Sequence, residues 1–462
     1  MINSIAQIKR PFFVGIAGTG MSAIAQYLQG IGMQVSGSDR YFNQGEAHDI
    51  KEKLTNEGIL CHNQNAGWLN TTNTDLLVCS TAIEDTVPEV LLAKAQGIPI
   101  IKRSELLALI ALSKKTIAIG GTSGKSTTCA MLYNILVTAG LQPSIISGAG
   151  LVSIINEGKI GNAKVGSGAW LVIEADESDG SIVQYKAAVG LLLNVDKDHK
   201  DIETLMQLFE QFKHNSKHFI VNQSHYLAKQ LSSEVNNDFS ITMANAGTMA
   251  SNFEAKGLAI QFLVNNTAIH INAIGRHTME NATAAIAVAL HCGATLQHCA
   301  TALAAYQGIY RRHQIIGQKN NLWLIDDYGH NPVKCAASIA ACQPLSTKVI
   351  AWFQPHGYGP TKFLRADFVS ELAAVLRPTD VMVMSEIYYA GGTTVKDISA
   401  NDLIQDLQKL GKNALFINNR KDLVTTLQQH HIIGDNEPAV LLLMGARDPS
   451  LEGFAAQVWA WL

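Results

Sequence analysis

The sequence has few of the features that mark secreted, membrane-bound or nucleic-acid-binding proteins. Its seven cysteines form no C-x-x-C pair, which fits reduced thiols in a cytosolic protein. It has no run of lysine or arginine, and its net charge is −3, so we expect neither nucleic acid nor a membrane as a partner. No apolar run reaches the ~18 residues of a transmembrane helix. These absences predict a cytoplasmic enzyme that acts on small molecules.

Low-complexity tracts and short-period repeats are also missing. The N-terminus has the order of a secretory signal peptide, with Lys9-Arg10 before an apolar stretch. However, three glycines interrupt that stretch, and the pattern continues as a helix into a second strand, so we expect it to be part of the fold. With 462 residues, of which 47% are apolar, the chain is long enough for about three domains.

The stretch from Thr116 to Thr128 has the pattern of a phosphate-binding loop, because an apolar strand runs into glycines, a lysine and hydroxyl residues just before a helical pattern. The glycines allow backbone N–H groups to approach a polyphosphate, and the helix presents its positive end to the same anion. We expect Lys125 on the β/γ-phosphates and the Ser126 hydroxyl on Mg²⁺. The first glycine of the longer loop pattern is missing, so a glycine-rich turn without nucleotide is the alternative.

The first ~110 residues alternate between strand and helix patterns, which predicts a parallel sheet with helices on its faces. The expected strands are 12–16, 33–36, 76–80 and 98–101, and the expected helices are 21–30 and 90–96. A glycine-rich turn follows the first strand, and Asp39 comes 19 residues after Gly20, near the spacing of an acid that binds a ribose hydroxyl. The glycine order departs from G-x-G-x-x-G, so a dinucleotide or another diphosphate could bind there.

Polar clusters follow two strands of the second region, residues ~112 to ~313. They comprise Glu174, Asp176, Glu177 and Asp179 in one, and Asn194, Asp198 and His199 in the other. Ligands gather at the carboxyl ends of strands in open α/β sheets, so these clusters should converge with the phosphate loop. The carboxylates would repel one another without a cation such as Mg²⁺, which takes oxygen ligands. A solvated acidic loop is the alternative.

A helix and a third α/β region complete the chain. His277 and Asn281 lie four residues apart at the start of an alanine-rich helix and share one of its faces. Strands are then expected at 322–325, 349–353, 381–385, 414–417 and 439–444. Polar residues again follow the strand ends, so this region should supply half of a ligand cleft.

Taken in order, these motifs resemble the Mur ligases over essentially the whole chain. The set is far more specific than any one member: Gly15–Ser22, Gly37–Asp39, Gly121–Ser126, Glu174–Asp179, Asn194 with Asp198-His199, Gly275–His277 with Asn281, Arg311-Arg312 and Asp326–Pro332. The resemblance implies an α/β fold of three domains. These are a Rossmann-like UDP-sugar-binding domain (1–111), a central P-loop ATPase-type domain with a parallel sheet (112–313), and a Rossmann-like C-terminal domain (314–462) that closes over ATP and binds the acceptor amino acid.

The resemblance also implies a reaction in cytoplasmic peptidoglycan precursor synthesis. An amino acid, L-alanine by default, is joined to the lactyl carboxylate of UDP-N-acetylmuramate through an acyl phosphate, with ATP and two Mg²⁺ ions as cofactors. The implied metal ligands are Ser126, Glu174 and His199, and the expected catalytic residues are Lys125, Glu174, His199 and His330.

The remaining site residues expected from the resemblance form three sets. ATP is expected at Gly121, Thr122, Ser123, Gly124, Lys125, Ser126, Thr127, His277, Asn281, Arg312 and Asp327, with the histidine and asparagine on adenine, the aspartate on the ribose and the arginine on the phosphates. The UDP-sugar is expected at Gly18, Thr19, Gly20, Met21, Ser22, Ser38, Asp39, Ser80, Thr81 and Ala82. The acceptor is expected at Tyr328, His330 and His356.

The sequence departs from the family most seriously in the loop that follows strand 349–353. The alanine-adding branch carries two arginines there, at the places of Gly357 and Pro360, which bind the amino-acid carboxylate; both are missing. A buried carboxylate without a charged partner is costly, so we expect Lys362 or Arg365 to replace them, near a helix start at Thr361. Solvated positions for both charges are the alternative.

Two other departures are milder. Ser126 stands for the usual threonine, and His214 occupies the place of a carbamylated lysine that the alanine-adding branch lacks. Three interpretations therefore stay open: an amino-acid ligase, a ligase that attaches a preformed tripeptide in cell-wall recycling, and a UDP-sugar-binding or NAD-dependent protein without ligase chemistry. Intact Lys125, Glu174 and His199 argue against the last.

Overall fold

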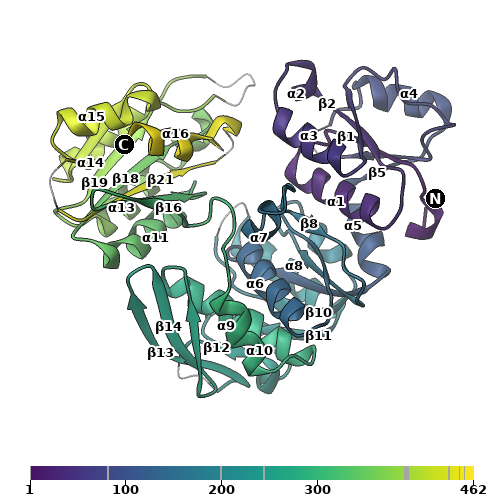
Figure 1. Cartoon of the computed structure of the whole chain (residues 1–462), viewed down its shortest axis with the longest axis horizontal. Coiled ribbons are helices and arrows are strands. Elements are labelled where there is room, and N and C mark those ends of the chain that lie inside the picture. The colour runs from purple at the N-terminus through teal and green to yellow at the C-terminus, as the bar shows by residue number, and fades with distance from the viewer. Residues whose placement is uncertain are drawn as a thin grey trace. The chain divides into compact units, whose positions relative to one another are not determined.

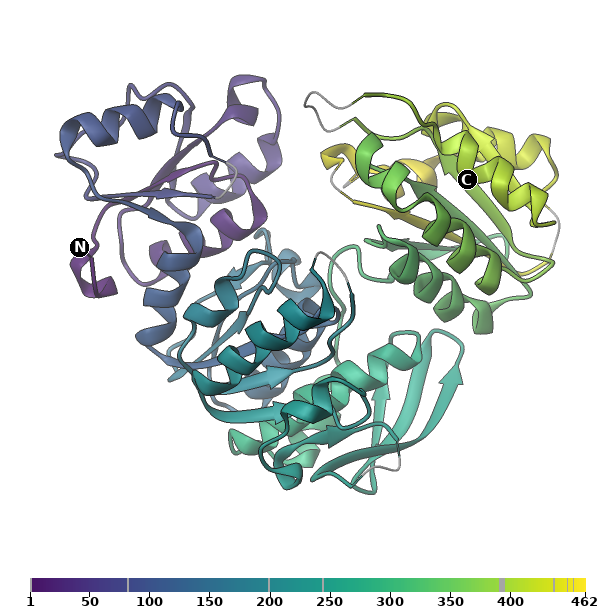
Figure 2. The same cartoon turned by 180° about the vertical axis from the view of Figure 1, so that it is seen from behind.

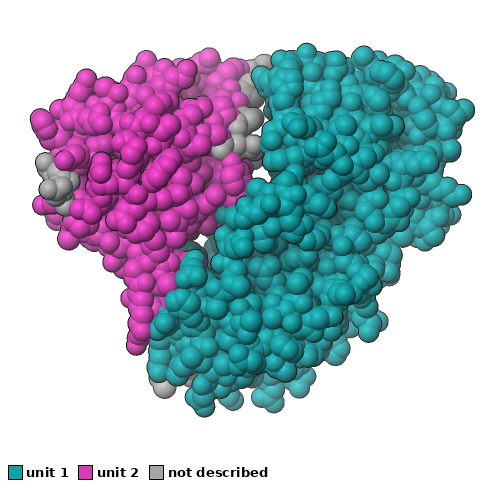
Figure 3. Space-filling view, in the orientation of Figure 1, with its two compact units in different colours: residues 1–253, 261–272, 277–309 teal, residues 254–260, 273–276, 310–462 magenta. Residues whose placement is uncertain are grey.

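The structure is a computed structural model that describes residues 2–80, 83–197, 200–242, 245–389, 395–434, 437–446, 448–451 and 453–462 (Figures 1 and 2). The chain forms two compact units (Figure 3): unit 1 holds residues 1–253, 261–272 and 277–309, and unit 2 holds 254–260, 273–276 and 310–462. Within the described ranges, no helix is both long and apolar enough to cross a bilayer. All seven cysteines are free thiols.

The N-terminal part of unit 1 is a five-stranded parallel sheet with helices around it. The strand order is β3 (Leu60–Asn63), β2 (Ser36–Asp39), β1 (Pro11–Val14), β4 (Leu76–Cys79) and β5 (Ile100–Lys102). The helices are α1 (Thr19–Gly30), α2 (Arg40–Asn43), α3 (His48–Asn56), α4 (Pro88–Gln96) and α5 (Arg103–Leu112). Strand β1 is buried on both faces: Phe13 packs into one core, and Phe12 and Val14 pack into another. A continuous apolar run is the pattern of such a strand.

The second strand lies further along the chain than we predicted. We expected residues 33–36, whereas β2 spans Ser36–Asp39, a stretch whose glycine, serines and aspartate resemble a turn. Its glycine is required by packing, because a Cβ at Gly37 would lie 2.6 Å from the Phe13 carbonyl oxygen and 2.7 Å from Ile16. Tertiary packing thus overrides the low strand propensity of these residues.

The central part of unit 1 is a six-stranded sheet. Its order is β11 (Ser216–Val221), β10 (Ala187–Leu192), β6 (Lys115–Gly120), β9 (Trp170–Glu174), β7 (Ser144–Ile146) and β8 (Ala163–Lys164), parallel except for the pair β7–β8. The helices of this part of the chain are α6 (Lys125–Thr138), α7 (Val152–Ile155), α8 (Ile202–His214), α9 (Arg276–His291) and α10 (Leu296–Ala304).

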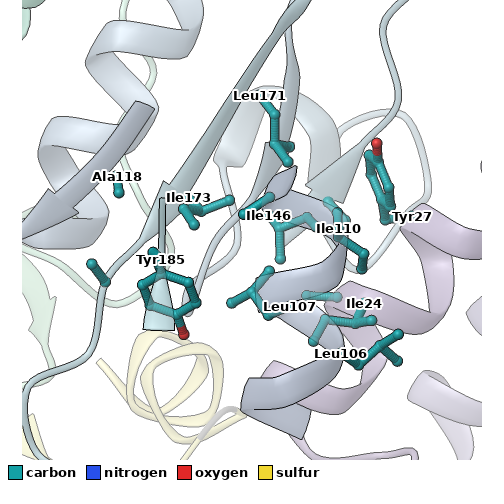
Figure 4. Close-up of a cluster of buried hydrophobic side chains, with 14 of the residues drawn as sticks. Ile24, Tyr27, Leu106, Leu107, Ile110, Ala118, Ile146, Leu171, Ile173 and Tyr185 are labelled. Atoms are coloured by element: carbon teal, nitrogen blue, oxygen red, sulfur yellow. The ribbon is translucent and has the colours of Figure 1, made fainter. Parts of the chain in front are cut away.

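One hydrophobic core joins the N-terminal and central parts of unit 1. Helices α1 and α5 contribute Ile24, Leu107 and Ile110, and the central sheet contributes Ile146 and Ile173 to the same cluster (Figure 4). Helix α5 ends only three residues before β6 begins, so no linker separates the two parts. The turn that starts α1 is therefore held against the central sheet by shared apolar burial.

A four-stranded sheet follows that the sequence analysis did not predict. Its order is β12 (Phe239–Ser240), β13 (Thr248–Lys256), β14 (Ala259–Val264) and β15 (Thr267–Ile271). The signal was present, because β14 alternates between half-buried and buried residues. Asn265 and Asn266 then form a two-residue connection to β15 with φ of 45° and 66°, as in the tight turns of β-hairpins.

Unit 2 is built on a second six-stranded sheet. Its order is β16 (Gln314–Lys319), β17 (Leu322–Asp327), β21 (Ala439–Gly445), β18 (Lys348–Gln354), β19 (Val381–Ser385) and β20 (Ala414–Ile417), parallel except for β16–β17. Its helices are α11 (Pro332–Cys342), α12 (Tyr358–Phe363), α13 (Arg365–Val375), α14 (Ala400–Lys409), α15 (Leu423–Gln429) and α16 (Phe454–Trp461). Strand β18 is apolar throughout its middle because Ala351 and Phe353 enter one core while Ile350 and Trp352 enter the other.

Candidate active site

The loop between β6 and α6 has the backbone that its glycines predict. Gly121 and Gly124 adopt φ of 135° and 85°, and Gly124 caps the N-terminus of α6. A Cβ at Gly124 would collide with the Asn281 side chain, so the close approach of α9 also requires glycine there. The N-terminus of α6 therefore lies at the carboxyl end of β6, where the first N–H groups of a helix can receive an anion.

Asn194 holds the loop in this conformation. Its Oδ1 accepts hydrogen bonds from Thr122 Oγ1 and Ser123 N, both 2.9 Å, and its Nδ2 donates to Ser123 O at 3.2 Å. Because β10 pairs with β6 at Leu192 and Gly120, Asn194 lies beside the loop. The resemblance included Asn194, but we assigned it no role; its position two residues beyond the strand was the available signal.

Lys125 is held over the loop by two acceptors. Its Nζ donates to Gly121 O and to Glu177 Oε2, each at 2.7 Å, and the Glu177 side chain is only 6% exposed. Burial alone would lower the pKa of Lys125, but the nearby carboxylates, Glu177 first, raise it. The lysine therefore stays cationic, which its expected role on phosphates requires.

Glu174 and the N-terminal turn line one cleft with Lys125. Its lining residues are Gly20, Ile24, Arg103, Leu107, Lys125, Ile146, Ser147, Gly148, Glu174 and Asp176. Glu174 is the last residue of β9 and pairs with Ile119, just before the loop. Its Oε1 accepts from Ser147 Oγ at 2.7 Å and Gly148 N at 2.6 Å, which fixes the carboxylate at the cleft. The structure thus brings together Gly20, Lys125 and Glu174, predicted for three different ligands.

Arg103 is the cation of this cleft that the sequence analysis missed. It begins α5, its Nη2 lies 3.3 Å from Asp179 Oδ2, and its guanidinium lies against Gly20. It therefore stands between the N-terminal turn and the acidic cluster that follows β9. No local pattern marks this arginine, because its neighbours come from distant parts of the chain.

The turn that begins α1 is built by buried polar residues. Asp39 Oδ2 accepts from Ala17 N at 2.9 Å, and Ser38 O accepts from Gly15 N at 2.8 Å. From the central part of unit 1, the Nδ2 atom of the buried Asn162 donates to Thr19 O at 2.8 Å. The side chains predicted for the UDP-sugar at Met21, Ser22, Ser38 and Asp39 are all buried, whereas Gly18, Thr19, Gly20 and Ser80 are exposed or half-buried.

Three site residues expected from the sequence, His199, Thr81 and Ala82, lie outside the described residues. In α9, Asn281 is buried beside the phosphate loop, where its Oδ1 lies 3.4 Å from Thr128 Oγ1, and His277 is half-buried. Ser126 and Thr127 are half-buried in the first turn of α6.

In unit 2, Asp327 organises the turn after β17. Its carboxylate accepts from His313 N and Gly329 N, each at 2.9 Å, and from Ser338 Oγ at 2.7 Å. Burial would raise its pKa, but His313, Arg312 and these donors together lower the pKa of Asp327 to about 2. A ribose hydroxyl, the partner we predicted, would have to share oxygens that already receive three hydrogen bonds.

Asp327→Asn should lower the free energy of unfolding of unit 2 by about 2 kcal/mol at pH 7, because an amide cannot accept all of these hydrogen bonds. The folded pKa of Asp327, about 2, lies below that of an unfolded aspartate, so the carboxylate stabilises the fold above about pH 4 and loses this effect as pH falls toward 2. Urea denaturation should show a constant deficit from pH 7 to about 4.5 that shrinks below. Asp367→Asn, at an exposed position of α13, is the matched control. An equal stability of variant and wild type at pH 7 would contradict this role.

Histidines and aromatic rings lie at the carboxyl edge of the same sheet. His330 Nδ1 donates to Tyr328 O at 2.9 Å, so its Nε2 is the acceptor nitrogen. Burial lowers the pKa of His330 to about 4, and Lys334, Arg312 and His356 add to the effect. The His330 and His356 rings are 6.1 Å apart, and the Arg312 guanidinium lies 4.8 Å from the Tyr328 ring centre.

The two cations predicted for the acceptor carboxylate both have carboxylate partners. Lys362 Nζ lies 2.5 Å from Asp397 Oδ2, and Arg365 Nη2 lies 2.7 Å from Asp406 Oδ2. The helix start expected at Thr361 is wrong, because α12 begins at Tyr358 and Thr361 lies inside it, where its hydroxyl donates to Gly357 O.

This fold and this site define an α/β protein in which the glycine-rich loop between β6 and α6 shares a cleft with the glycine-containing turn that begins α1. The chain belongs to the Mur ligase family. It matches, in chain order, the Mur ligase family, catalytic domain (residues 12–115), the Mur ligase middle domain (119–289) and the Mur ligase, glutamate ligase domain (311–447).

Two relatives of this chain carry the same name. The UDP-N-acetylmuramate–L-alanine ligase of Geobacter sulfurreducens is 33% identical over 476 residues, covering 98% of each chain. That of Trichlorobacter lovleyi is 34% identical, covering 90% of this chain and 92% of its own. Two solved structures share the fold: the UDP-N-acetylmuramate-alanine ligase of Thermotoga maritima (24% identity, TM-score 0.79, 98% and 100% coverage) and a murein peptide ligase of Psychrobacter arcticus (19%, 0.66, 98% and 98%).

Proposed function

We propose that this protein is an ATP-dependent ligase that joins an amino acid, L-alanine by default, to the lactyl carboxylate of UDP-N-acetylmuramate in the cytoplasm. The observation that carries the proposal is the cleft of unit 1, in which Gly20, Lys125 and Glu174 lie together. A UDP-sugar on the α1 turn and ATP on the phosphate loop would meet there. Relatives named UDP-N-acetylmuramate–L-alanine ligase, which this chain matches over at least 92% of their length, support the same conclusion.

In the proposed reaction, a carboxylate oxygen of the sugar attacks the γ-phosphorus of ATP, and the bond to ADP breaks. The acceptor amine then attacks the acyl carbon, loses a proton, and expels phosphate together with that carboxylate oxygen. Negative charge develops on the phosphoryl oxygens in the first step, and on the acyl oxygen and the leaving phosphate in the second, so catalysis needs charge neutralisation and positioning. Lys125, which its acidic neighbours keep charged, supplies the neutralising charge. The loop held by Asn194 supplies the positioning.

The acceptor amine is expected at the edge of unit 2. His330 is neutral at physiological pH and offers Nε2 as an acceptor, because its Nδ1–H is committed to Tyr328 O. We propose that it orients the amine by accepting one of its hydrogens. Tyr328 and His356 flank it, with ring centres 5.6 and 6.1 Å from that of His330.

The residues around Glu174 suit Mg²⁺. One fixed carboxylate and the Ser126 hydroxyl are hard oxygen donors, and Mg²⁺ needs few protein ligands when substrate phosphates complete its shell. Among the described residues, no three His, Cys, Asp or Glu side chains are placed to hold a metal ion by themselves. We propose that Ser126, Glu174 and His199 hold two ions. Bound there, they would neutralise phosphate charge.

We further propose the nucleotide contacts expected from the sequence. The phosphates of ATP would bind to Thr122, Ser123 and Thr127, to the loop glycines and to Arg312. The adenine would bind to His277 and Asn281, and the ribose would bind to Asp327. Gly18–Ser22, Ser38, Asp39 and Ser80–Ala82 would form the UDP-sugar site, with the buried side chains shaping it. The proposed domain bounds are 1–111, 112–313 and 314–462.

His199→Ala should raise the Mg²⁺ concentration needed for half-maximal rate and lower the maximal rate. A neutral imidazole is a weak ligand for Mg²⁺, so its expected contribution is mainly to place the ion beside the carboxylate. A Mg²⁺ titration of initial rates checks this. The matched control is His214→Ala, an exposed histidine on α8 that pairs with Glu210. Unchanged activity at saturating Mg²⁺ would show that His199 is structural.

The proposed function is tested by phosphate release in an omission series. Release should require ATP, UDP-N-acetylmuramate and an acceptor together. A panel with L-alanine, other amino acids and a preformed tripeptide identifies the acceptor, which matters because Gly357 and Pro360 replace two arginines of the alanine-adding branch. ATP hydrolysis that ignores the UDP-sugar would refute the assignment.

A further inference from the structure

A row of rings follows three strands of unit 2 at one edge of its sheet. Tyr328 and His330 follow β17, His356 and Tyr358 follow β18, and Tyr389 follows β19. These strands run parallel, with β21 between β17 and β18. The backbones of His356 and Tyr388 form a parallel β-bridge. The rings of Tyr358 and Tyr389 have centres 6.1 Å apart. The chain segments that carry the two ring groups, Tyr328, His330 and His356 in one and Tyr358 and Tyr389 in the other, thus meet at this edge of the sheet.

Lys396 places a positive charge beside the rings of Tyr358 and Tyr389. Its Nζ lies 4.3 Å from the Tyr389 ring centre and 5.8 Å from that of Tyr358. Ring faces attract an ammonium ion without cancelling its net charge. No carboxylate of the described residues lies within ion-pair distance of Lys396, and the residue is exposed. Its charge is therefore available to an anion from solution.

The two cations that we predicted for the acceptor carboxylate, Lys362 and Arg365, differ from Lys396 because each has a carboxylate partner. Lys362 is paired with Asp397, and Arg365 is paired with Asp406. An acceptor carboxylate could bind either one only by displacing or sharing its present partner. At Lys396 it would add a hydrogen-bonded ion pair without displacing a carboxylate, while the ammonium group keeps its contacts with the rings.

We propose that Lys396 binds the α-carboxylate of the acceptor, in place of the two arginines missing from the loop after β18. The inference rests on the proposed ligase function and names the residue that selects its acceptor. The ligand is an α-carboxylate, carried by a free amino acid or by a short peptide. Tyr358 and Tyr389 position the ammonium group, and Gly357 contributes no side chain that would obstruct the approach.

The test compares acceptors with and without the carboxylate. With L-alanine as the varied substrate, Lys396→Ala should raise the acceptor KM at least about tenfold, equivalent to about 1.4 kcal/mol. The KM values for ATP and UDP-N-acetylmuramate and the kcat should stay within about twofold, the signature of lost acceptor binding. Wild type should prefer L-alanine over L-alaninamide, and Lys396→Ala should lose most of that preference. Lys396→Arg should restore it.

Parallel variants decide between cations. Lys409→Ala, an exposed and ion-paired lysine of α14, is the control for removing a positive charge from this unit. If Lys362→Ala or Arg365→Ala raises the acceptor KM while Lys396→Ala does not, the inference is overturned in favour of the cations of α12 and α13. If the tripeptide and not L-alanine is turned over, the same comparison uses the tripeptide and its C-terminal amide. A wild type that uses no acceptor refutes the proposed function, and the assignment of Lys396 falls with it.

Discussion

Lys125→Ala is expected to lower the rate of phosphate release by more than about 10²-fold, the scale of removing one well-placed charge from a transition state. Affinity for UDP-N-acetylmuramate should stay within a few fold, because the sugar nucleotide is expected on the α1 turn and ATP on the β6–α6 loop. Steady-state kinetics and titration calorimetry on the same variant measure both quantities.

Two controls separate chemistry from folding in this experiment. Lys125→Ala leaves Glu177, which is 6% exposed, without its cation, so the double variant with Glu177→Gln removes the unpaired charge. Lys115→Ala removes a lysine at the exposed start of β6, the strand that precedes the phosphate loop, and should leave the rate unchanged. A parallel collapse of UDP-sugar affinity in a folded Lys125→Ala protein would show that the two nucleotide sites have been confused.

Arg311→Ala should lower the free energy of unfolding of unit 2 by about 3–5 kcal/mol, because it leaves the buried carboxylate of Asp326 without its cationic partner. Arg311 Nε lies 3.0 Å from Asp326 Oδ2, the two side chains are 6% and 4% exposed, and Nη2 donates to Gly445 O at 2.9 Å. Urea denaturation followed by tryptophan fluorescence measures the loss.

The pH dependence of this loss has a defined sign. Burial raises the pKa of Asp326 to about 6, with Arg311 opposing, so removing the arginine should raise it further. A raised folded pKa means that stability is greatest below the unfolded pKa of about 4 and falls as pH rises through the folded value. The variant's deficit should therefore be larger at pH 8 than at pH 5. The double variant Arg311→Met, Asp326→Leu should recover most of the stability, and a loss below about 1 kcal/mol in Arg311→Ala would contradict the assignment.

The parts of this molecule that could be predicted from sequence are those that local chemistry determines. The phosphate loop follows from glycines, a lysine and a helix within 13 residues, and the acidic cluster follows from its position after an apolar strand. The parallel sheets follow from alternating strand and helix patterns. In these cases the residues that determine the structure are neighbours in the chain.

The rest depends on contacts between distant residues. Ser36–Asp39 reads as a turn until Phe13 and Ile16 pack against Gly37. Arg103 reaches Asp179, 76 positions away, and Arg311 reaches Gly445, 134 positions away, so neither partner could be paired from spacing. Lys396 has no motif, and only the fold brings it to Tyr358. The hairpin at Asn265-Asn266 is different, because its signal was local and was overlooked.

Amide formation through an acyl phosphate is tested most directly with UDP-N-acetylmuramate whose lactyl carboxylate carries ¹⁸O in both positions. The phosphate released in the presence of ATP and acceptor should carry one ¹⁸O atom, and the amide product should retain the other, because the attacking carboxylate oxygen leaves with phosphorus. Mass spectrometry of both products measures this transfer. Phosphate released without ¹⁸O would mean that water, and not the sugar carboxylate, attacks ATP, and would contradict ligation through an acyl phosphate.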